Sequence, residues 1–251
     1  MDTPKPNISR IYDYVLGGTH NLEVDRNAVR EILKVFPAYP RWARLNRDFL
    51  KAMATRWAAE GRTHLLDIGS GMPTLGHFHT IMTRARVLYS DNDPVTVAYA
   101  REVIGDDPRI SYLEVDVRKT ELLLRAAEQH FGEERKVAIG FIGVAYLIED
   151  ASLKQMLRTL YDWAAPGSVL ALSQVAMTTT PQRNQETADP FRPSGAQIFT
   201  RDEAALRRIV GSWEVRELAP LDAWPGVTSP LHPGDDEGGM LNMLGVVLER
   251  S

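Results

Sequence analysis

The sequence predicts an α/β protein built on an open, mostly parallel sheet. From residue 64 onward, short apolar runs alternate with helical stretches at intervals of about 20 residues, the pattern of a parallel sheet with helices on both faces. The chain closes with two apolar runs, 213–218 and 241–249, that have no helix between them. Consecutive strands without a crossover helix cannot easily be parallel, so we expect an antiparallel hairpin at one edge.

The other expected strands are 64–68, 86–90, 110–115, 136–142 and 168–173, which makes seven strands in all. One helix is expected to begin at Asp93-Pro94, because Asp caps helix N-termini and Pro is favoured at the first helical position. Another is expected to begin at Thr200, where Glu203 completes a capping box.

Residues 1–62 are predicted to be helical. The expected helices cover 7–16, 24–36 and 40–60, and Gly17-Gly18, Pro37 and Gly61 end them. We therefore expect an N-terminal helical cap, residues 1–62, followed by a ligand-binding domain, residues 63–251. Residues 178–194 and 220–239 lack periodicity. The first of these stretches follows the fifth strand, so it either covers a substrate at the carboxyl edge of the sheet or is disordered.

Composition excludes several classes of function. The 251 residues are 44% apolar and 25% charged, with a net charge of −4 that gives no electrostatic case for nucleic acid as the main partner. The absence of cysteine removes disulfides, thiolate catalysis and cysteine-based metal sites. No signal-peptide pattern and no long apolar run is present, so we expect a cytoplasmic protein that does not bind membranes.

A glycine motif at the end of the first predicted strand carries most of the functional information. Leu65–Ile68 ends on an acid, Asp67, and runs into Gly69 and Gly71, where the backbone can turn sharply and approach a ligand. The next strand ends on Asp91, 20 residues after Gly71. An acid at that distance binds ribose hydroxyls in open α/β sheets. These residues predict a cofactor that contains a nucleoside, although Gly-x-Gly alone also occurs in ordinary strand–helix turns.

Two cofactors compete for this geometry. A dinucleotide site needs a third glycine where this chain has Thr74, and Gly76 comes two residues too late. A carboxylate at Asp67 suits an ammonium group better than a pyrophosphate. Both observations favour S-adenosylmethionine (SAM), which carries an ammonium group and no phosphate, over an NAD-linked oxidoreductase.

Three segments resemble class I SAM-dependent methyltransferases: Asp67-Ile-Gly-Ser-Gly71, Tyr89-Ser-Asp-Asn-Asp93 and Glu114-Val-Asp116. A more specific match is Arg10-Ile-Tyr-Asp-Tyr-Val-Leu-Gly-Gly18, with Asn21 and Asp25-Arg26. This opening resembles a bacterial family called S-adenosyl methyltransferase, formerly a domain of unknown function. The resemblance implies a Rossmann-like class I methyltransferase fold, with a seven-stranded sheet, an antiparallel edge hairpin and an N-terminal helical lid.

The resemblance also implies the cofactor contacts. Asp67, Gly69 and Gly71 are expected around the methionine portion, Asp91 on the ribose and Asn92 beside the adenine. Asp116 would accept a hydrogen bond from the adenine amino group, although it could instead be a helix cap. Val117, the next residue, is also expected to contact the cofactor. Gly143 to Tyr146 would lie beneath the sulfonium. Thr74 could join this site or only cap a helix.

The N-terminal motif could fold over the cofactor as a lid. In that case Arg10, Tyr14, Gly17 and Gly18 would contact the ligand, and Arg10 or Arg47 would pair with the methionine carboxylate. The alternative is that the paired glycines only end a helix.

The catalytic candidates are Tyr146 and His20, with Tyr12, Tyr14 and Glu149 as weaker possibilities. The family tends to have histidine at the position of Tyr146 and Ser-His at Ser173-Gln174, which leaves open a catalytically silent, SAM-binding regulatory module. No metal site is expected, because His77 and His79 do not share a helical face. Phe191, Phe199 and Trp224 could line an apolar pocket for a small organic acceptor of secondary metabolism. A homodimer is possible.

Overall fold

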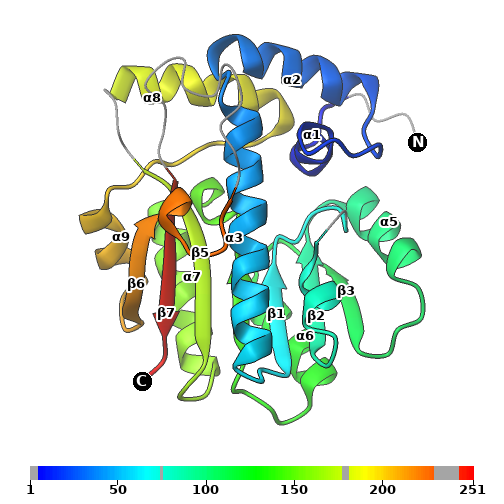
Figure 1. The fold of residues 1–251 in the computed structure, drawn as a ribbon, viewed down its shortest axis with the longest axis vertical. Coiled ribbons are helices and arrows are strands. Elements are labelled where there is room, and N and C mark those ends of the chain that lie inside the picture. The colour runs from blue at the N-terminus through cyan, green and yellow to red at the C-terminus, as the bar shows by residue number, and fades with distance from the viewer. Residues whose placement is uncertain (1–4, 74–75, 177–180, 229–242) are drawn as a thin grey trace.

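A computed structural model describes residues 5–73, 76–176, 181–228 and 243–251. Its core is one seven-stranded sheet with the order β3-β2-β1-β4-β5-β7-β6 (Figure 1). The strands are β1 His64–Ile68, β2 Arg86–Asp91, β3 Ile110–Glu114, β4 Ala138–Phe141, β5 Val169–Val175, β6 Glu214–Pro220 and β7 Met243–Glu249. All seven predicted strands are therefore present, and residues 241–242 of the last prediction lie outside the described residues.

The pairing confirms the predicted mixture of parallel and antiparallel strands. β1 pairs in parallel with β2 and β4, and β2–β3 and β4–β5 are also parallel. The last strand, β7, is inserted between β5 and β6 and runs antiparallel to both. The carboxyl ends of β1 to β5 consequently meet at one edge of the sheet, the upper edge in Figure 1.

Side chains alternate between the two faces of the sheet, and each face has its own apolar core. Leu65 and Tyr89 belong to the core that contains α3. Leu66 and Leu88 belong to the core that contains α6, α7 and α9. This double coverage explains why the central strands are continuous apolar runs.

The N-terminal helices are α1 Ile8–Val15, α2 Glu23–Val35 and α3 Tyr39–Ala59. The helices α1 and α2 lie above the carboxyl ends of the strands, whereas α3 runs from this cap down across the sheet (Figure 1). Near its lower end, Trp57 stacks on Phe78 with ring centroids 5.6 Å apart. Because α3 belongs to both layers, the division of the chain at residue 62 stays a prediction.

The remaining helices are α4 Phe78–Ile81, α5 Pro94–Ile104, α6 Thr120–Phe131, α7 Asp150–Trp163, α8 Pro181–Ala188 and α9 Glu203–Val210, with the 3₁₀ turns η1 Ala145–Leu147, η2 Asp189–Ser194 and η3 Leu221–Ala223. Asp93 caps α5 as predicted, by accepting a hydrogen bond from the backbone N–H of Thr96. None of the helices in the described ranges is both long and apolar enough to span a bilayer.

Two predictions about the second half of the chain were wrong. Residues 178–194 were expected to be irregular; residues 178–180 lie outside the described residues, and 181–194 form α8 and η2, which pack against α2 in the cap. The helix expected at Thr200 begins at Glu203, because the Asp202 side chain accepts the hydrogen bond of the Ala205 N–H. A carboxylate placed one residue before the helix is the stronger cap here.

Candidate functional site

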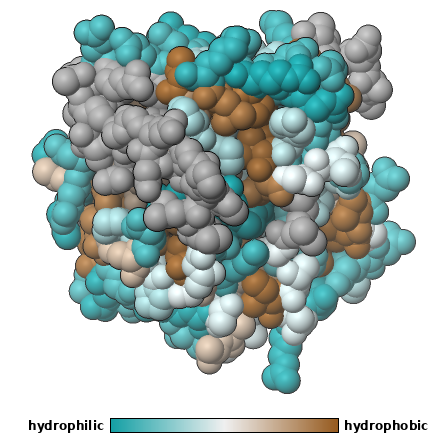
Figure 2. All heavy atoms as spheres, turned by 45° about the horizontal axis from the view of Figure 1, so that its top comes forward, coloured by the Kyte–Doolittle hydropathy of each residue, from teal (hydrophilic) through white to brown (hydrophobic). Residues whose placement is uncertain are grey.

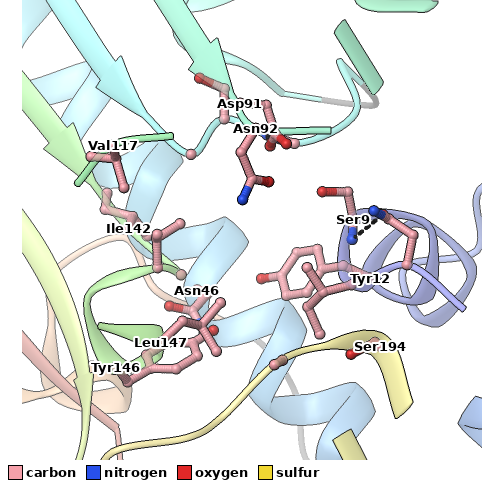
Figure 3. Close-up of a pocket in the computed structure, with 18 of the residues that line it drawn as sticks. Ser9, Tyr12, Asn46, Asp91, Asn92, Val117, Ile142, Tyr146, Leu147 and Ser194 are labelled. Atoms are coloured by element: carbon pink, nitrogen blue, oxygen red, sulfur yellow. Dashed lines mark hydrogen bonds between the residues drawn. The ribbon is translucent and has the colours of Figure 1, made fainter. Parts of the chain in front are cut away.

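A cavity of about 300 Å³ lies at the carboxyl ends of the strands, beneath the cap. Its walls come from the loops after β1 to β4, from α1 and α3, and from the segment around η2. Seen from above the strand ends, apolar side chains reach the surface near the middle of this face (Figure 2). Figure 3 shows Asp91 and Asn92 on one side of the cavity and Asn46, Tyr146 and Leu147 on the opposite side.

The glycine loop after β1 forms part of the cavity wall. Gly69 has φ +68°, and a Cβ atom there would lie 2.4 Å from Val144 Cγ2, so only glycine fits. Gly71 has φ +66°, and a Cβ there would meet only Ser9 Oγ at 3.9 Å, so this backbone faces open space. Both strand tips are joined at this point, because the Ser70 hydroxyl donates to the carbonyl of Asp67 and accepts from the N–H of Ser90. The loop is thus rigid and open toward the cavity.

The buried carboxylate of Asp91 is fixed by backbone donors. It accepts hydrogen bonds from the N–H groups of Gly71 and Asp93, each at 3.0 Å. Burial raises the pKa of this carboxyl group, while the two hydrogen bonds oppose the shift. A carboxylate offers about four lone-pair positions. Asp91 can therefore accept further hydrogen bonds from a ligand.

Asp67 and Arg47 provide opposite charges near the glycine loop. Asp67 is 3% exposed, and its burial raises the pKa of the carboxyl group to about 7, against the opposing effect of Arg47. Arg47 is half-buried, and its Nε and Nη1 atoms are buried without a hydrogen-bond partner. Unpaired guanidinium N–H groups can bind an anionic ligand group in a bidentate manner.

Three residues after β2 and β3 line the cavity where the adenine was predicted. Asn92 points its amide group into the cavity (Figure 3). Asp116 and Val117 line the cavity, and Arg118 Nε donates to both Asp116 oxygens at 2.9 and 3.0 Å. This interaction lowers the pKa of Asp116, so the carboxylate stays ionised at neutral pH. The carboxylate that was predicted to bind the adenine amino group is therefore already paired with Arg118.

Beyond β4, a polar chain holds the cavity floor in place. The N–H of Gly143 donates to Ser173 Oγ at 2.8 Å, and Ser173 Oγ donates to Asn46 Oδ1 at 2.5 Å. Tyr146 lines the cavity, and burial raises the pKa of its hydroxyl well above the usual value. A tyrosine with such a pKa remains protonated at neutral pH, so it can donate a hydrogen bond but is a poor base.

A buried arginine fixes the turn that carries Tyr146. Arg201 Nη1 donates to the carbonyl of Ala145 at 3.1 Å and to Gln174 Oε1 at 2.8 Å, and Nη2 bonds the carbonyl of Ile148. Its Nε donates to Asp150 at 2.9 Å. Gln174, where the family tends to have histidine, thus acts as an acceptor behind the site and does not line the cavity.

The first helix contributes to the cavity through Tyr12, a weaker catalytic candidate in the sequence analysis, and through two residues that were not predicted, Ser9 and Asp13. Ser9, Tyr12 and Asp13 line the cavity from one face of α1. The Tyr12 hydroxyl donates to the carbonyl of Ala43 at 2.8 Å, which ties α1 to α3. The spacing i, i+3, i+4 places these three side chains on one helical face, a signal that was present in the sequence.

Several predicted contacts are corrected. Arg10 is 3% exposed and pairs with Asp25 through Nε at 2.7 Å and Nη2 at 3.2 Å, so it is not free to bind a methionine carboxylate. Tyr14 does not line the cavity and is 37% exposed. Gly17 and Gly18 also lie outside the cavity, and their N–H groups bond the carbonyls of Tyr14 and Asp13 at the end of α1. They end the helix, which was the alternative interpretation.

The predicted base His20 is not at the site. Its ring lies outside the cavity, 4.1 Å from the ring of Tyr99 on α5, and is hydrogen-bonded to the Tyr99 hydroxyl. Thr74 lies outside the described residues. Of the predicted acceptor-pocket aromatics, Phe191 lines the cavity, whereas Phe199 does not and Trp224 packs against Phe49 in the core.

The structure adds residues that sequence reasoning missed. They include Ser9, Asp13, Tyr39, Trp42, Asn46, Leu147 and the segment 194–198. Trp42 and Asn46 lie four residues apart on α3, and the 194–198 segment follows η2 from the second half of the chain. Only the three-dimensional arrangement brings this segment to the cavity, so no local pattern could have identified it.

Comparisons with known proteins agree with this geometry. The family described as S-adenosyl methyltransferase matches residues 1–228. The fold is similar to that of a putative methyltransferase from Thermobifida fusca YX, with 27% identity, a TM-score of 0.87 and coverage of 100% of this chain and 97% of that one. It is equally similar, with a TM-score of 0.87, to a DUF574 family protein from Streptomyces avermitilis MA-4680, at 25% identity and coverage of 100% and 99%.

A more distant structure shares the fold alone. Magnesium protoporphyrin IX methyltransferase from Synechocystis PCC 6803, solved with bound S-adenosylhomocysteine (SAH), is 13% identical with a TM-score of 0.56 and coverage of 96% and 93%. No curated protein matches the chain. The family match covers most of the sequence and the predicted strand order is confirmed. The chain belongs to the S-adenosyl methyltransferase family, and its cofactor is therefore S-adenosylmethionine.

Proposed function

We propose that this methyltransferase modifies a small-molecule acceptor in the cavity beneath the cap. The observation that carries the proposal is the meeting of Asp67, Asp91 and Arg47, whose Nε and Nη1 atoms lack a hydrogen-bond partner, around one cavity of about 300 Å³. A volume of that size suits part of a small organic molecule rather than a polymer segment. The net charge of −4 also gives no electrostatic support for a nucleic-acid acceptor.

The adenosyl half of the cofactor is assigned to the tips of β2 and β3. The free lone pairs of Asp91 would accept both ribose hydroxyls, in charge-assisted hydrogen bonds. Asn92 and Val117 would flank the adenine, and Asp116 would accept a hydrogen bond from the adenine amino group. Support comes from the cavity lining, which includes all four residues, and from Figure 3, where Asp91, Asn92 and Val117 lie in the upper half of the view.

The methionine half is assigned to the tip of β1. Arg47 would bind the carboxylate through its buried N–H groups, and Asp67 would bind the ammonium. Gly71 leaves the backbone accessible at this point. The opposite charges of Arg47 and Asp67 match the two charges of an amino acid, which a pyrophosphate lacks.

The contribution of the protein to catalysis is assigned to positioning of the methyl acceptor. When bound, SAM supplies an electrophilic methyl group. Among the described residues, the cavity lining contains no histidine, and burial raises the pKa values of Tyr12, Tyr39 and Tyr146. Their hydroxyls remain protonated and can only orient an acceptor by hydrogen bonding. Tyr146 is thus proposed to be an orienting group, and holding the acceptor in line is the main contribution of the protein.

Two measurements test the proposal. Calorimetric titration with SAH and with NAD in parallel is expected to show binding of SAH only. Incubation with radiolabelled SAM and a panel of small metabolites is expected to transfer label to at least one of them. Binding of NAD in preference to SAH would overturn the cofactor assignment. Transfer of label to RNA or protein, with none to small molecules, would overturn the acceptor class.

A further inference from the structure

The side of the cavity opposite the acids is built from aromatic rings. The ring centroids of Trp42 and Tyr146 are 4.9 Å apart, and those of Tyr39 and Phe191 are 5.1 Å apart. Trp42 and Tyr39 are also in contact, at 5.6 Å, and Tyr12 reaches in from α1 (Figure 3). We call these five residues the aromatic wall.

The aromatic wall is uncharged. Its described neighbours in the cavity lining are Asn46, Leu147 and the segment 194–198, which has the sequence Ser-Gly-Ala-Gln-Ile. The cavity lining also includes charged residues, of which Asp67, Asp91, Asp116 and Arg47 belong to the proposed cofactor contacts, and Arg118 pairs with Asp116. Asp13 directs its carboxylate at the turn after α1, where Oδ2 accepts a hydrogen bond from the N–H of His20 and Oδ1 lies against Gly18. A charged acceptor would lose its hydration here without gaining an ion pair, so this half of the cavity selects against charge.

One polar group in the aromatic wall lacks a partner. Trp42 is 5% exposed, and its Nε1 atom is buried without a hydrogen-bond partner. A buried tryptophan N–H usually has a partner, because leaving it unpaired costs about 1–3 kcal/mol. The other buried tryptophans include Trp213 and Trp224, whose Nε1 atoms donate to the carbonyls of Leu157 and Ala219. Trp42 differs from these two in lining the cavity.

We infer that the aromatic wall is the acceptor subsite and that it takes a neutral, planar aromatic molecule. The rings of Trp42, Tyr146 and Phe191 would pack against the ring of the acceptor in stacked or edge-to-face contacts. An oxygen or a ring nitrogen of the methyl acceptor would accept a hydrogen bond from the Nε1–H of Trp42. An ammonium compound, although attracted to aromatic faces, would place its own N–H donors against that N–H. The inference rests on the proposed function.

The first test compares 2-naphthol with three analogues, one saturated, one anionic and one cationic. The protein is saturated with SAH, and calorimetry measures the binding of 2-naphthol, 2-decalol, 2-naphthoate and 2-naphthylmethylamine. We expect 2-naphthol to bind at least tenfold more tightly than the saturated alcohol or either charged naphthalene. Equal or tighter binding of any of the other three would overturn the inference. Failure of SAH itself to bind would instead overturn the proposed function.

The second test uses matched tryptophan variants. Trp42→Phe keeps an aromatic ring and removes the N–H, so we expect 2-naphthol to bind about three- to tenfold more weakly with the SAH affinity unchanged. Trp224→Phe makes the same change at a buried tryptophan outside the cavity and is expected to alter neither affinity. Unchanged binding of 2-naphthol to Trp42→Phe would overturn the role of the N–H.

A third variant tests the ring contribution. Phe191→Leu keeps an apolar side chain and removes an aromatic ring, so we expect about threefold weaker binding of 2-naphthol and unchanged binding of 2-decalol. An equal loss for both alcohols would indicate a pocket that recognises only apolar volume, and would overturn the aromatic class. Thermal unfolding of each variant, followed with SAH present, reports whether the fold is retained.

Discussion

The two sides of the cavity are built in different ways. The acid side comes from the tips of β1, β2 and β3: Asp67 and Asp91 lie at the ends of their strands, and Asp116 follows β3 by two residues. The aromatic wall comes from four separate segments, α1, α3, η1 and η2. The first side is a local property of each strand end, whereas the second depends on how the cap packs.

The largest effect is expected from a substitution in the glycine loop of the acid side, and it concerns the free energy of unfolding. Gly69→Ala places a Cβ atom 2.4 Å from Val144 Cγ2. The matched control is Gly105→Ala, which has nearly the same backbone angle, φ +67°, and no atom within 4 Å of the new Cβ. We expect the control to lower the free energy of unfolding by about 1 kcal/mol and Gly69→Ala by about 3 kcal/mol or more. Denaturant unfolding measures both, and equal losses would show that Val144 moves aside without cost.

Removing Asp91 tests the ribose assignment. Asp91→Ala is expected to weaken SAH binding by about 1.5–3 kcal/mol, because two charge-assisted hydrogen bonds would be lost. The control, Asp162→Ala, removes an exposed carboxylate on α7 and is expected to leave the affinity unchanged. Calorimetry gives both values. An Asp91→Ala protein that binds SAH as tightly as the parent would remove Asp91 from the site.

Arg201 supports the aromatic wall, because it holds the turn that carries Tyr146. Arg201→Lys cannot reproduce hydrogen bonds to Ala145, Gln174 and Asp150 together, so we expect a loss of about 1–2 kcal/mol in stability. The binding of 2-naphthol is expected to weaken more than that of SAH. Arg207→Lys on the exposed face of α9 is the control. Equal weakening for both ligands would mean that Arg201 supports the whole cavity rather than the turn.

The smallest effect is a pH dependence from Asp67. Its pKa of about 7 in the cofactor-free protein means that the carboxyl gains its charge between pH 6 and 8, so SAH affinity is expected to rise about three- to tenfold over that range. Burial also raises the pKa of the neighbouring Asp91 carboxyl. The variant Asp67→Asn isolates the effect and is expected to show a flatter profile. An unchanged profile would place the titrating group elsewhere.

The same raised pKa has a consequence for stability. A carboxyl whose folded pKa lies above its unfolded value near 4 destabilises the folded protein as pH rises from 4 through 7. Cofactor-free Asp67→Asn is therefore expected to be more stable than the parent at pH 8, and to lose this advantage at pH 4. Thermal unfolding at the two pH values provides the check. Lower stability of the variant at pH 8 would mean that Asp67 has an ion-pair partner.

The sequence predicted those parts of the molecule that depend on local patterns. The strands agree with the prediction to within about two residues, because apolar runs and capping residues are short-range signals. Asp67, Asp91, Asp116 and Gly143 line the cavity as predicted, because each lies at or just after the carboxyl end of a strand of the parallel sheet. Their contacts with the cofactor remain predictions.

The wrong predictions concern residues whose partners are distant in the chain. Arg10 was expected to bind the ligand, but Asp25 of α2 satisfies it. His20 was expected to act as a base, but α5 supplies its partner, Tyr99. Periodicity gives the face of a helix without saying what covers that face, so the pairing of α1 with α2 could not be deduced.

The ion pair between Arg10 and Asp25 determines how the cavity can open. The Asp25 carboxylate accepts from Arg10 and also from the backbone N–H groups of Asn7 and Leu22, and it is 0% exposed. These contacts hold the first two helices together as one unit, because breaking them would leave a buried charge without a partner. Ser9 and Tyr12 belong to that unit, so we expect any movement of α1 away from the cavity to carry α2 with it.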